Sequence, residues 1–207
     1  PILWSVTPQM RAAGYEAIEM NTELLQQCVE GYAESAQRCL RAGFDFVEIE
    51  AAHPPALTSS LLSSYQNRRT DEYGGSFENR IRFLLEVIRA TRQRVGKKVT
   101  LGMRTMCDEG VGEPGWTTMD LFRLAPLVEK EGIDYLSLAL GNETETIHLV
   151  YPSIYEPQGV FVHLAEELKK HVRIPVIVAG RIKDPVMADQ IVKEGKADLV
   201  IMARAHL

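Results

Sequence analysis

The sequence predicts an α/β fold with a parallel sheet, organised as part of a (β/α)8 TIM barrel. Three observations support this prediction: a repeated junction between helix and strand, helices that alternate with the strands, and strands that have one polar face. With 207 residues, the chain is long enough for one domain with a sizeable core. We therefore treat residues 1–207 as a single domain.

A glycine-containing junction recurs at residues 42–49, 131–138 and 194–201. Each copy predicts a helix that ends at glycine, a very short turn and then a buried strand. Glycine is common at helix ends because it adopts the left-handed conformation easily, and tight loops are normal between a helix and the next strand. Two further apolar runs, residues 99–103 and 175–179, bring the predicted strands to five.

Apolar residues at helical spacing predict helices between these strands. The first helix begins behind a cap at Asn21 or Thr22, and a later one starts at Thr117 or Thr118. Asp184 caps the last helix, with proline at the first helical position. Because alternating strands and helices require crossover connections, the sheet is expected to be parallel.

The polarity of the strands distinguishes part of a barrel from an open doubly wound sheet. Along residues 46–50, Val47 and Ile49 face one side, whereas Glu48 and Glu50 face the other. A central strand of an open sheet is covered by helices on both faces and is therefore apolar throughout. We favour the barrel, because its strands can carry polar groups inward near the C-terminal mouth.

Composition excludes several classes of function. The net charge is −5 with acids and bases interleaved, so we expect no nucleic-acid partner. No apolar run reaches the roughly 18 residues that a membrane span requires, and no signal peptide opens the chain. Cys28, Cys39 and Cys107 have no metal-ligand spacing, so we expect no metal site. Free thiols without an export signal indicate the cytoplasm.

The most specific motif is residues 67–80, NRRTDEYGGSFENR. From its residues alone, this is a polar loop braced by ion pairs. It also closely resembles the loop after the fourth barrel strand of the old yellow enzyme / NADH:flavin oxidoreductase family, in the branch of 2,4-dienoyl-CoA reductase and trimethylamine dehydrogenase. The resemblance extends over residues 22–95, 101–104 and 178–204.

This resemblance implies a (β/α)8 barrel that holds FMN at its C-terminal mouth. The chain would supply strands four to eight, with residues 1–20 as the loop after strand three, and would thus be a partial barrel. NAD(P)H is implied as the reductant and a small molecule as the substrate. A 4Fe–4S cluster is compatible with a longer parent protein, but the cysteines of this chain provide no ligands for it.

The resemblance also assigns cofactor-binding residues. Arg104 is implied beside the flavin pyrimidine, where a cation stabilises negative charge; the alternative is an ion pair inside the barrel with Glu48 or Glu50. The residues implied at the FMN phosphate are Gly180, Arg181, Ala203 and Arg204. Barrel phosphate sites form after the last two strands, and arginine suits phosphate.

The catalytic positions depart from the family pattern. Many members place two donors and a tyrosine where this sequence has Glu50, His53 and Pro55. An ionised carboxylate cannot donate a hydrogen bond, and proline cannot supply a proton. His53 remains the candidate for orienting the substrate. His148, in residues 141–152, is the candidate proton donor, with a solvated loop histidine as the alternative.

Three functions remain open at this point. The first is an FMN oxidoreductase that passes hydride from NAD(P)H to an α,β-unsaturated carbonyl. The second is a flavin-dependent amine dehydrogenase or demethylase, in which Glu50 holds a cationic amine. The third is an inactive barrel fragment that binds no FMN and associates through its exposed edges with another copy of itself, as a homo-oligomer, or with another chain.

Overall fold

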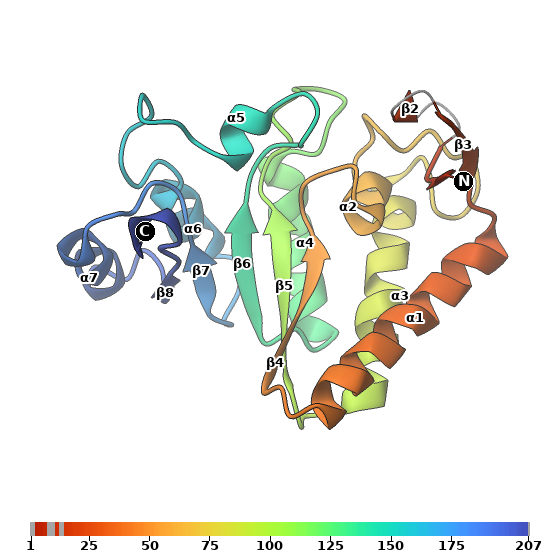
Figure 1. Ribbon diagram of the computed structural model, residues 1–207, viewed down its shortest axis with the longest axis horizontal. Helices are drawn as coiled ribbons and strands as arrows, with labels where there is room; N and C mark the ends of the chain where they lie inside the picture. Colours follow the sequence, from red (N-terminus) through yellow and green to blue (C-terminus); the bar gives the residue numbers. More distant parts are fainter. Residues whose placement is uncertain (1–2, 8–10, 13–14, 207) are drawn as a thin grey trace.

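The computed structural model describes residues 3–7, 11–12 and 15–206 (Figure 1). Its main sheet contains five parallel strands, and their spatial order follows the sequence without reversal. The order of a doubly wound sheet reverses, so this arrangement is that of a barrel segment, as predicted. The strands are β4 (Phe46–Ala51), β5 (Thr100–Met106), β6 (Tyr135–Ala139), β7 (Val176–Val178) and β8 (Leu199–Val200).

Helices connect these strands, and three predicted helix starts are confirmed. The Asn21 side chain accepts from the Leu24 N–H at 2.9 Å, Thr117 forms a capping box, and the Asp184 carboxylate accepts from the Val186 N–H at 2.9 Å. The longer helices are α1 (Thr22–Arg41), α3 (Phe77–Val95), α4 (Thr118–Lys130), α6 (Val162–Leu168) and α7 (Pro185–Lys193). The shorter ones are α2 (Leu57–Leu62), α5 (Ile147–Val150) and the 3-10 turn η1 (Arg204–His206).

The helices cover one face of the main sheet and leave the other open. Figure 1 shows α4 and α6 behind the strands. On β4, Ile49 is buried, whereas Glu48 and Glu50 on the opposite face are exposed. The apolar side chains of Phe46 and Leu199, on the two outermost strands, are 63% and 53% exposed. The polar face expected from the strand pattern is therefore the open, inner face.

An aspartate fixes the register where two of the repeated junctions enter the sheet. The Asp134 N–H donates to the Leu101 carbonyl at 2.8 Å, and the Asp134 carboxylate accepts from the Leu101 N–H at 2.8 Å. Asp198 makes the same two bonds to Val176, at 2.9 and 2.8 Å. We call this two-bond arrangement an aspartate clasp. Each clasp ties a strand to the strand that precedes it in the chain.

A small second sheet precedes α1. It contains β1 (Leu3–Ser5), β2 (Arg11–Ala12) and β3 (Tyr15–Glu19) in the order β1-β3-β2. The expectation that residues 1–20 form a loop is therefore incomplete. These strands have two to five residues, too few for a periodic pattern to identify them.

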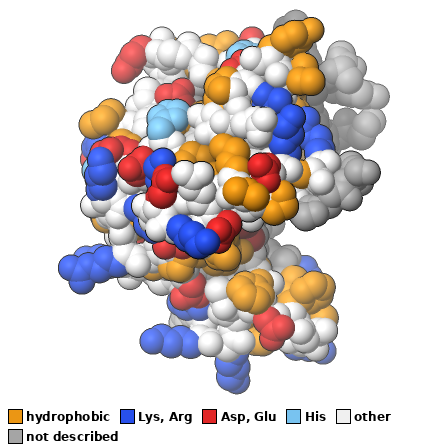
Figure 2. Space-filling view, turned by 90° about the vertical axis from the view of Figure 1, so that its left-hand side faces the viewer, with side chains coloured by type: hydrophobic (Ala, Val, Ile, Leu, Met, Phe, Trp, Pro, Cys, Tyr) orange, Lys and Arg blue, Asp and Glu red, His pale blue; other side chains and the backbone are white. Residues whose placement is uncertain are grey.

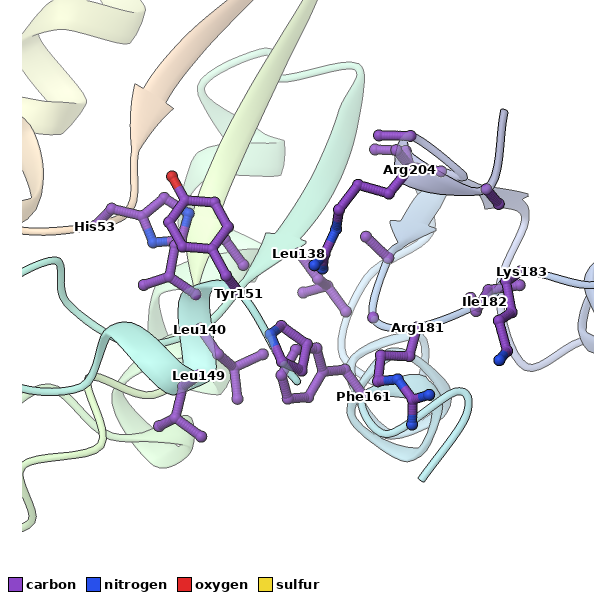
Figure 3. A pocket seen from close by; sticks show the side chains of 18 of the residues that line it. His53, Leu138, Leu140, Leu149, Tyr151, Phe161, Arg181, Ile182, Lys183 and Arg204 are labelled. Carbon is purple, nitrogen blue, oxygen red and sulfur yellow. The ribbon is translucent and has the colours of Figure 1, made fainter. Parts of the chain in front are cut away.

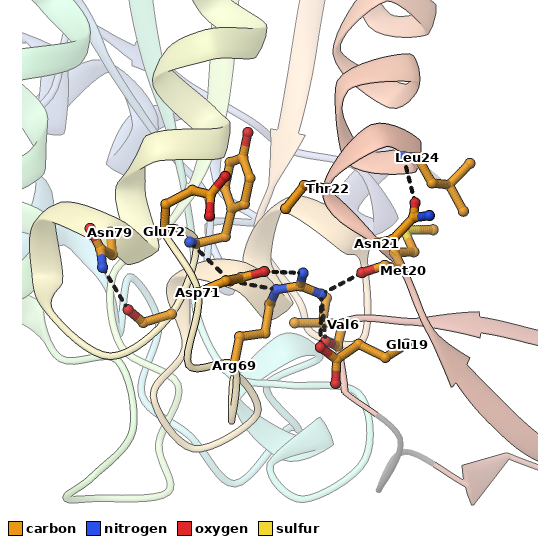
Figure 4. Close-up of polar contacts among 12 residues, drawn as sticks. Val6, Glu19, Met20, Asn21, Thr22, Leu24, Arg69, Asp71, Glu72 and Asn79 are labelled. Carbon is orange, nitrogen blue, oxygen red and sulfur yellow. Dashed lines mark hydrogen bonds and ion pairs between the residues drawn. The ribbon is translucent and has the colours of Figure 1, made fainter.

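The Arg69 side chain fastens the loop of residues 67–80 to this small sheet (Figure 4). Its guanidinium is buried; Nε donates to Asp71 Oδ1 at 3.0 Å, and Nη1 donates to the Met20 and Val6 carbonyls at 2.7 and 3.3 Å. Glu19 lies 3.4 Å from the same Nη1. The interpretation of this loop as one braced by ion pairs is confirmed.

Candidate functional site

A cavity of about 590 Å³ lies at the C-terminal ends of the main strands. This volume is within the range of roughly 300–1,000 Å³ that is usual for small-molecule sites. Because the carboxyl ends of parallel strands meet at one edge, residues far apart in the sequence gather here. Six of the predicted site residues line the cavity (Figure 3): His53, Arg104, Gly180, Arg181, Ala203 and Arg204.

Arg104 contacts two other predicted residues, Glu50 and His53. Glu50 on β4 is the register partner of Arg104 on β5, and Glu50 Oε2 lies 3.7 Å from Arg104 Nε. Arg104 Nη2 lies 3.4 Å from His53 Nε2. The ion pair that the sequence allowed with Glu48 or Glu50 is therefore made with Glu50, while Arg104 still borders the cavity.

The contacts of His53 define its tautomer. Arginine can only donate, so His53 Nε2 is the acceptor in the contact with Arg104. Nδ1, which lies 3.4 Å from the Gly141 carbonyl oxygen, then carries the proton. Burial, and next the positive charge of Arg104, lower the pKa of His53 below its usual range. The neutral imidazole is therefore favoured at neutral pH. The backbone of His53 is left-handed, with φ of 54°.

Glu50 lies beside the cavity rather than in its lining. Burial raises the pKa of the Glu50 carboxyl, although the hydrogen bond from the Ala52 N–H at 2.8 Å and the charge of Arg104 oppose this rise. The carboxylate thus sits partly exposed next to a cation and can interact electrostatically with a group bound in the cavity.

The β7 and β8 ends of the cavity can bind an anion. Gly180 and Arg181 are consecutive left-handed residues, with φ of 121° and 53°. Within the described part of the chain, no backbone acceptor takes a hydrogen bond from the N–H of Gly180, Arg181 or Ala203. Such free N–H groups beside arginine side chains suit a phosphate. In Figure 3, the Arg204 side chain extends toward Leu138.

The β6 side of the cavity is mainly apolar and includes residues that the sequence did not single out. Leu138, Leu140, Leu149 and Tyr151 line it, and Phe161 lies beyond them at the β7 end, against Gly180 (Figure 3). Tyr151 belongs to residues 141–152, the segment chosen for its histidine, and this residue is 57% exposed. This wall provides an apolar surface against which an aromatic ring could pack.

His148, like Glu50, is a predicted site residue that does not line the cavity. It lies on α5 and is exposed, whereas its neighbours Leu149 and Val150 line the cavity. Its role as a proton donor remains a prediction.

The described residues also bear on metals and membranes. Within residues 3–7, 11–12 and 15–206, no three His, Cys, Asp or Glu side chains gather where they could hold a metal ion. No helix in the described ranges is both long and apolar enough to cross a bilayer.

Comparison with known proteins places these features in a family. The model of the NADH:flavin oxidoreductase / NADH oxidase family matches residues 6–207. The chain is 38% identical to the NADH oxidase of Thermoanaerobacter brockii, covering 92% of this chain and 29% of that protein. It is 32% identical to the cinnamate reductase of Clostridium sporogenes, covering 98% of this chain and 32% of that protein.

The histamine dehydrogenase structure from Rhizobium sp. 4-9 superimposes with a TM-score of 0.85 at 28% identity. The superposition covers 99% of this chain and 29% of that one. The chain therefore spans about a third of the length of each of these relatives.

Proposed function

Because this chain belongs to the NADH:flavin oxidoreductase / NADH oxidase family, we propose that the whole protein is an FMN-dependent oxidoreductase that passes hydride from NAD(P)H to an α,β-unsaturated carbonyl. One observation carries the proposal: the free backbone N–H groups after β7 and β8 border the same cavity as Arg104 and His53. A phosphate group and a reacting ring could thus be held together.

The cavity residues fit FMN in three respects. The N–H groups of Gly180, Arg181 and Ala203, with the Arg204 guanidinium, suit its phosphate. The apolar β6 side suits its ring, and Arg104 provides a cation where negative charge develops. FMN, when bound, supplies the hydride transfer, whereas the chain supplies position and charge.

His53 and His148 complete the proposed assignment. A neutral His53 can orient a substrate carbonyl by turning its Nδ1–H from the Gly141 carbonyl. His148 is our candidate for protonating the substrate carbon, and Tyr151, which lines the cavity three residues later, is the alternative donor. A Tyr151→Phe variant that loses enone turnover while His148→Gln keeps it would assign the proton to Tyr151.

The test uses the purified whole protein. A yellow protein whose flavin absorbance bleaches anaerobically with NADH or NADPH, and returns on addition of an enone, is expected. A flavin that NAD(P)H reduces, but that an enone reoxidises no faster than buffer does, would contradict the proposed substrate. A colourless protein that does not take up added FMN would support the inactive-fragment alternative.

A second candidate, amine dehydrogenation, is favoured by Glu50. Its carboxylate lies beside the cavity, where it suits a cationic amine far better than a carbonyl oxygen. Methylated amines should then reduce the flavin, and Glu50→Gln should abolish this reduction. Glu48→Gln, on the same strand face but further from the mouth, is the matched control. Amine turnover unchanged by Glu50→Gln would exclude this role.

We also propose that the protein works in the cytoplasm, because Cys28, Cys39 and Cys107 are free thiols. The exposed Phe46 and Leu199 side chains support self-association of the chain by itself. Light scattering at several concentrations would measure this association, and a strictly monomeric chain would contradict it.

A further inference from the structure

Phe161 packs directly on the backbone of Gly180. A Cβ atom added to Gly180 would lie 2.6 Å from Phe161 Cδ2 and 3.1 Å from Cγ, so the ring occupies the space that any side chain would need. Phe161 is almost fully buried, yet it lines the same cavity as Gly180 and Arg181. Its ring is therefore part of the wall that shapes the turn after β7.

The position of Phe161 is itself fixed by two neighbouring helices. Two residues earlier, a Cβ added to Gly159 would lie 2.3 Å from the Met187 methyl carbon on α7. The Val162 N–H donates to the Gly159 carbonyl at 2.9 Å, and the Leu164 N–H donates to the Phe161 carbonyl at 3.1 Å. The backbone that carries Phe161 is thus tied to the start of α6, and Gly159, two residues earlier, packs against the side of α7.

The turn that Phe161 touches needs external support. Arg181 is left-handed at φ 53°, a conformation that a non-glycine residue keeps only when its surroundings impose it. Ile182 is buried and anchors the turn in the core. Phe161 contacts the preceding residue, Gly180, from the cavity. Two apolar contacts therefore constrain the backbone, and its N–H groups meet no backbone acceptor among the described residues.

We propose that Phe161 is a positioning residue for the phosphate-binding turn: its ring holds the Gly180-Arg181 backbone with its N–H groups available to the phosphate of FMN. This inference rests on the proposed FMN site. Phe161 is apolar and makes no hydrogen bond to phosphate, so it acts only through the turn. Removing the ring should therefore weaken the binding of ligands that carry the phosphate and leave the binding of ligands without it unchanged.

The test compares FMN with riboflavin, which shares the ring but has no phosphate. Dissociation constants are measured on the whole protein by quenching of flavin fluorescence. Phe161→Ala should weaken FMN binding by about tenfold or more, the effect of losing a hydrogen bond to a charged group, and should change riboflavin binding by less than about twofold. Phe161→Leu, which retains apolar contact with Gly180, should restore most of the FMN preference.

A control separates this effect from general destabilisation. Leu168 is fully buried at the other end of α6 and does not line the cavity. Leu168→Ala should lower the melting temperature without changing the ratio of the two dissociation constants. If Phe161→Ala weakens the binding of FMN and of riboflavin equally, the inference is overturned, whereas the proposed function still stands. A wild-type protein that binds neither ligand would overturn the proposed function, and the inference with it.

Discussion

Arg104 donates toward the imidazole of His53: Nη2 lies 3.4 Å from Nε2, on the wall of the cavity. A protonated His53 could not accept this contact and would place two cations side by side. Burial, and next the charge of the arginine, lower the pKa of His53 and favour its neutral form, so this pair influences how the site responds to pH.

The stability of the protein should depend on His53 in mildly acidic solution. Because the pKa of His53 is lowered in the folded state, the unfolded chain takes up this proton first as the pH falls below about 6.5. The free energy of unfolding should therefore decrease from that pH down to the lowered pKa. Urea titrations across this interval should show a smaller decrease in the free energy of unfolding for His53→Asn, which lacks the titrating group. Asparagine is chosen because it tolerates the left-handed backbone. His163 is exposed, and His163→Asn serves as the control. If it reduces the pH-dependent loss of stability as much as His53→Asn does, this assignment is contradicted.

The inner face of β5 should not tolerate a side chain at Gly102. A Cβ atom there would lie 2.0 Å from Cζ of the Tyr135 ring on β6. We expect Gly102→Ala to reduce the free energy of unfolding by about 1–3 kcal/mol, as for other overpacked sites. Gly31→Ala in α1, where an added Cβ meets nothing within 4 Å, should instead stabilise by about 0.5–1 kcal/mol. Chemical denaturation measures both, and equal effects would refute the role of the tyrosine ring.

Arg69 should be hard to replace even by lysine. Its guanidinium donates to Asp71 and to two backbone carbonyls at once, and one ammonium group cannot reach all of these acceptors. Arg69→Lys should lower the free energy of unfolding by about 2 kcal/mol. Lys193→Met, which removes an exposed ion pair with Asp189, should change it by less than about 1 kcal/mol. Comparable losses in the two variants would show that the Arg69 contacts contribute little.

Arg181 should show a trade-off between stability and binding. Glycine adopts φ 53° without strain, so Arg181→Gly should keep the melting temperature or raise it. The same change removes a cation from the proposed phosphate site and should weaken FMN binding. Lys183→Met, which removes a nearby cation without backbone strain, should leave the melting temperature unchanged. A lower melting temperature in Arg181→Gly would mean that the arginine side chain stabilises the turn.

Residue patterns predict the parts of this fold that follow from local periodicity. Alternation along β4 and β5 determines that Glu50 and Arg104 share a face, and the repeated junctions define where β4, β6 and β8 begin. Since the strands are parallel, their C-terminal ends necessarily meet, and this brings Arg104, Gly180 and Ala203 to one cavity.

Other features depend on contacts that no local pattern encodes. Tyr151 and Phe161 reach the cavity from segments whose path is determined by packing against other parts of the chain. His148 lies on a single helical turn, and the sequence does not determine which way so short a helix faces. The tautomer of His53 follows from Arg104 and Gly141, which are distant in sequence.

The aspartate clasps have a consequence for the outer edge of β4. Asp45 precedes β4 as Asp134 precedes β6 and Asp198 precedes β8, yet none of the described residues donates to the Asp45 carboxylate. At that edge, Asp45 could therefore form an aspartate clasp with a further parallel strand, through the same pair of bonds. At the β5/β6 and β7/β8 pairs, alignment of the two strands is accordingly secured locally, and it does not require the ring of strands to close.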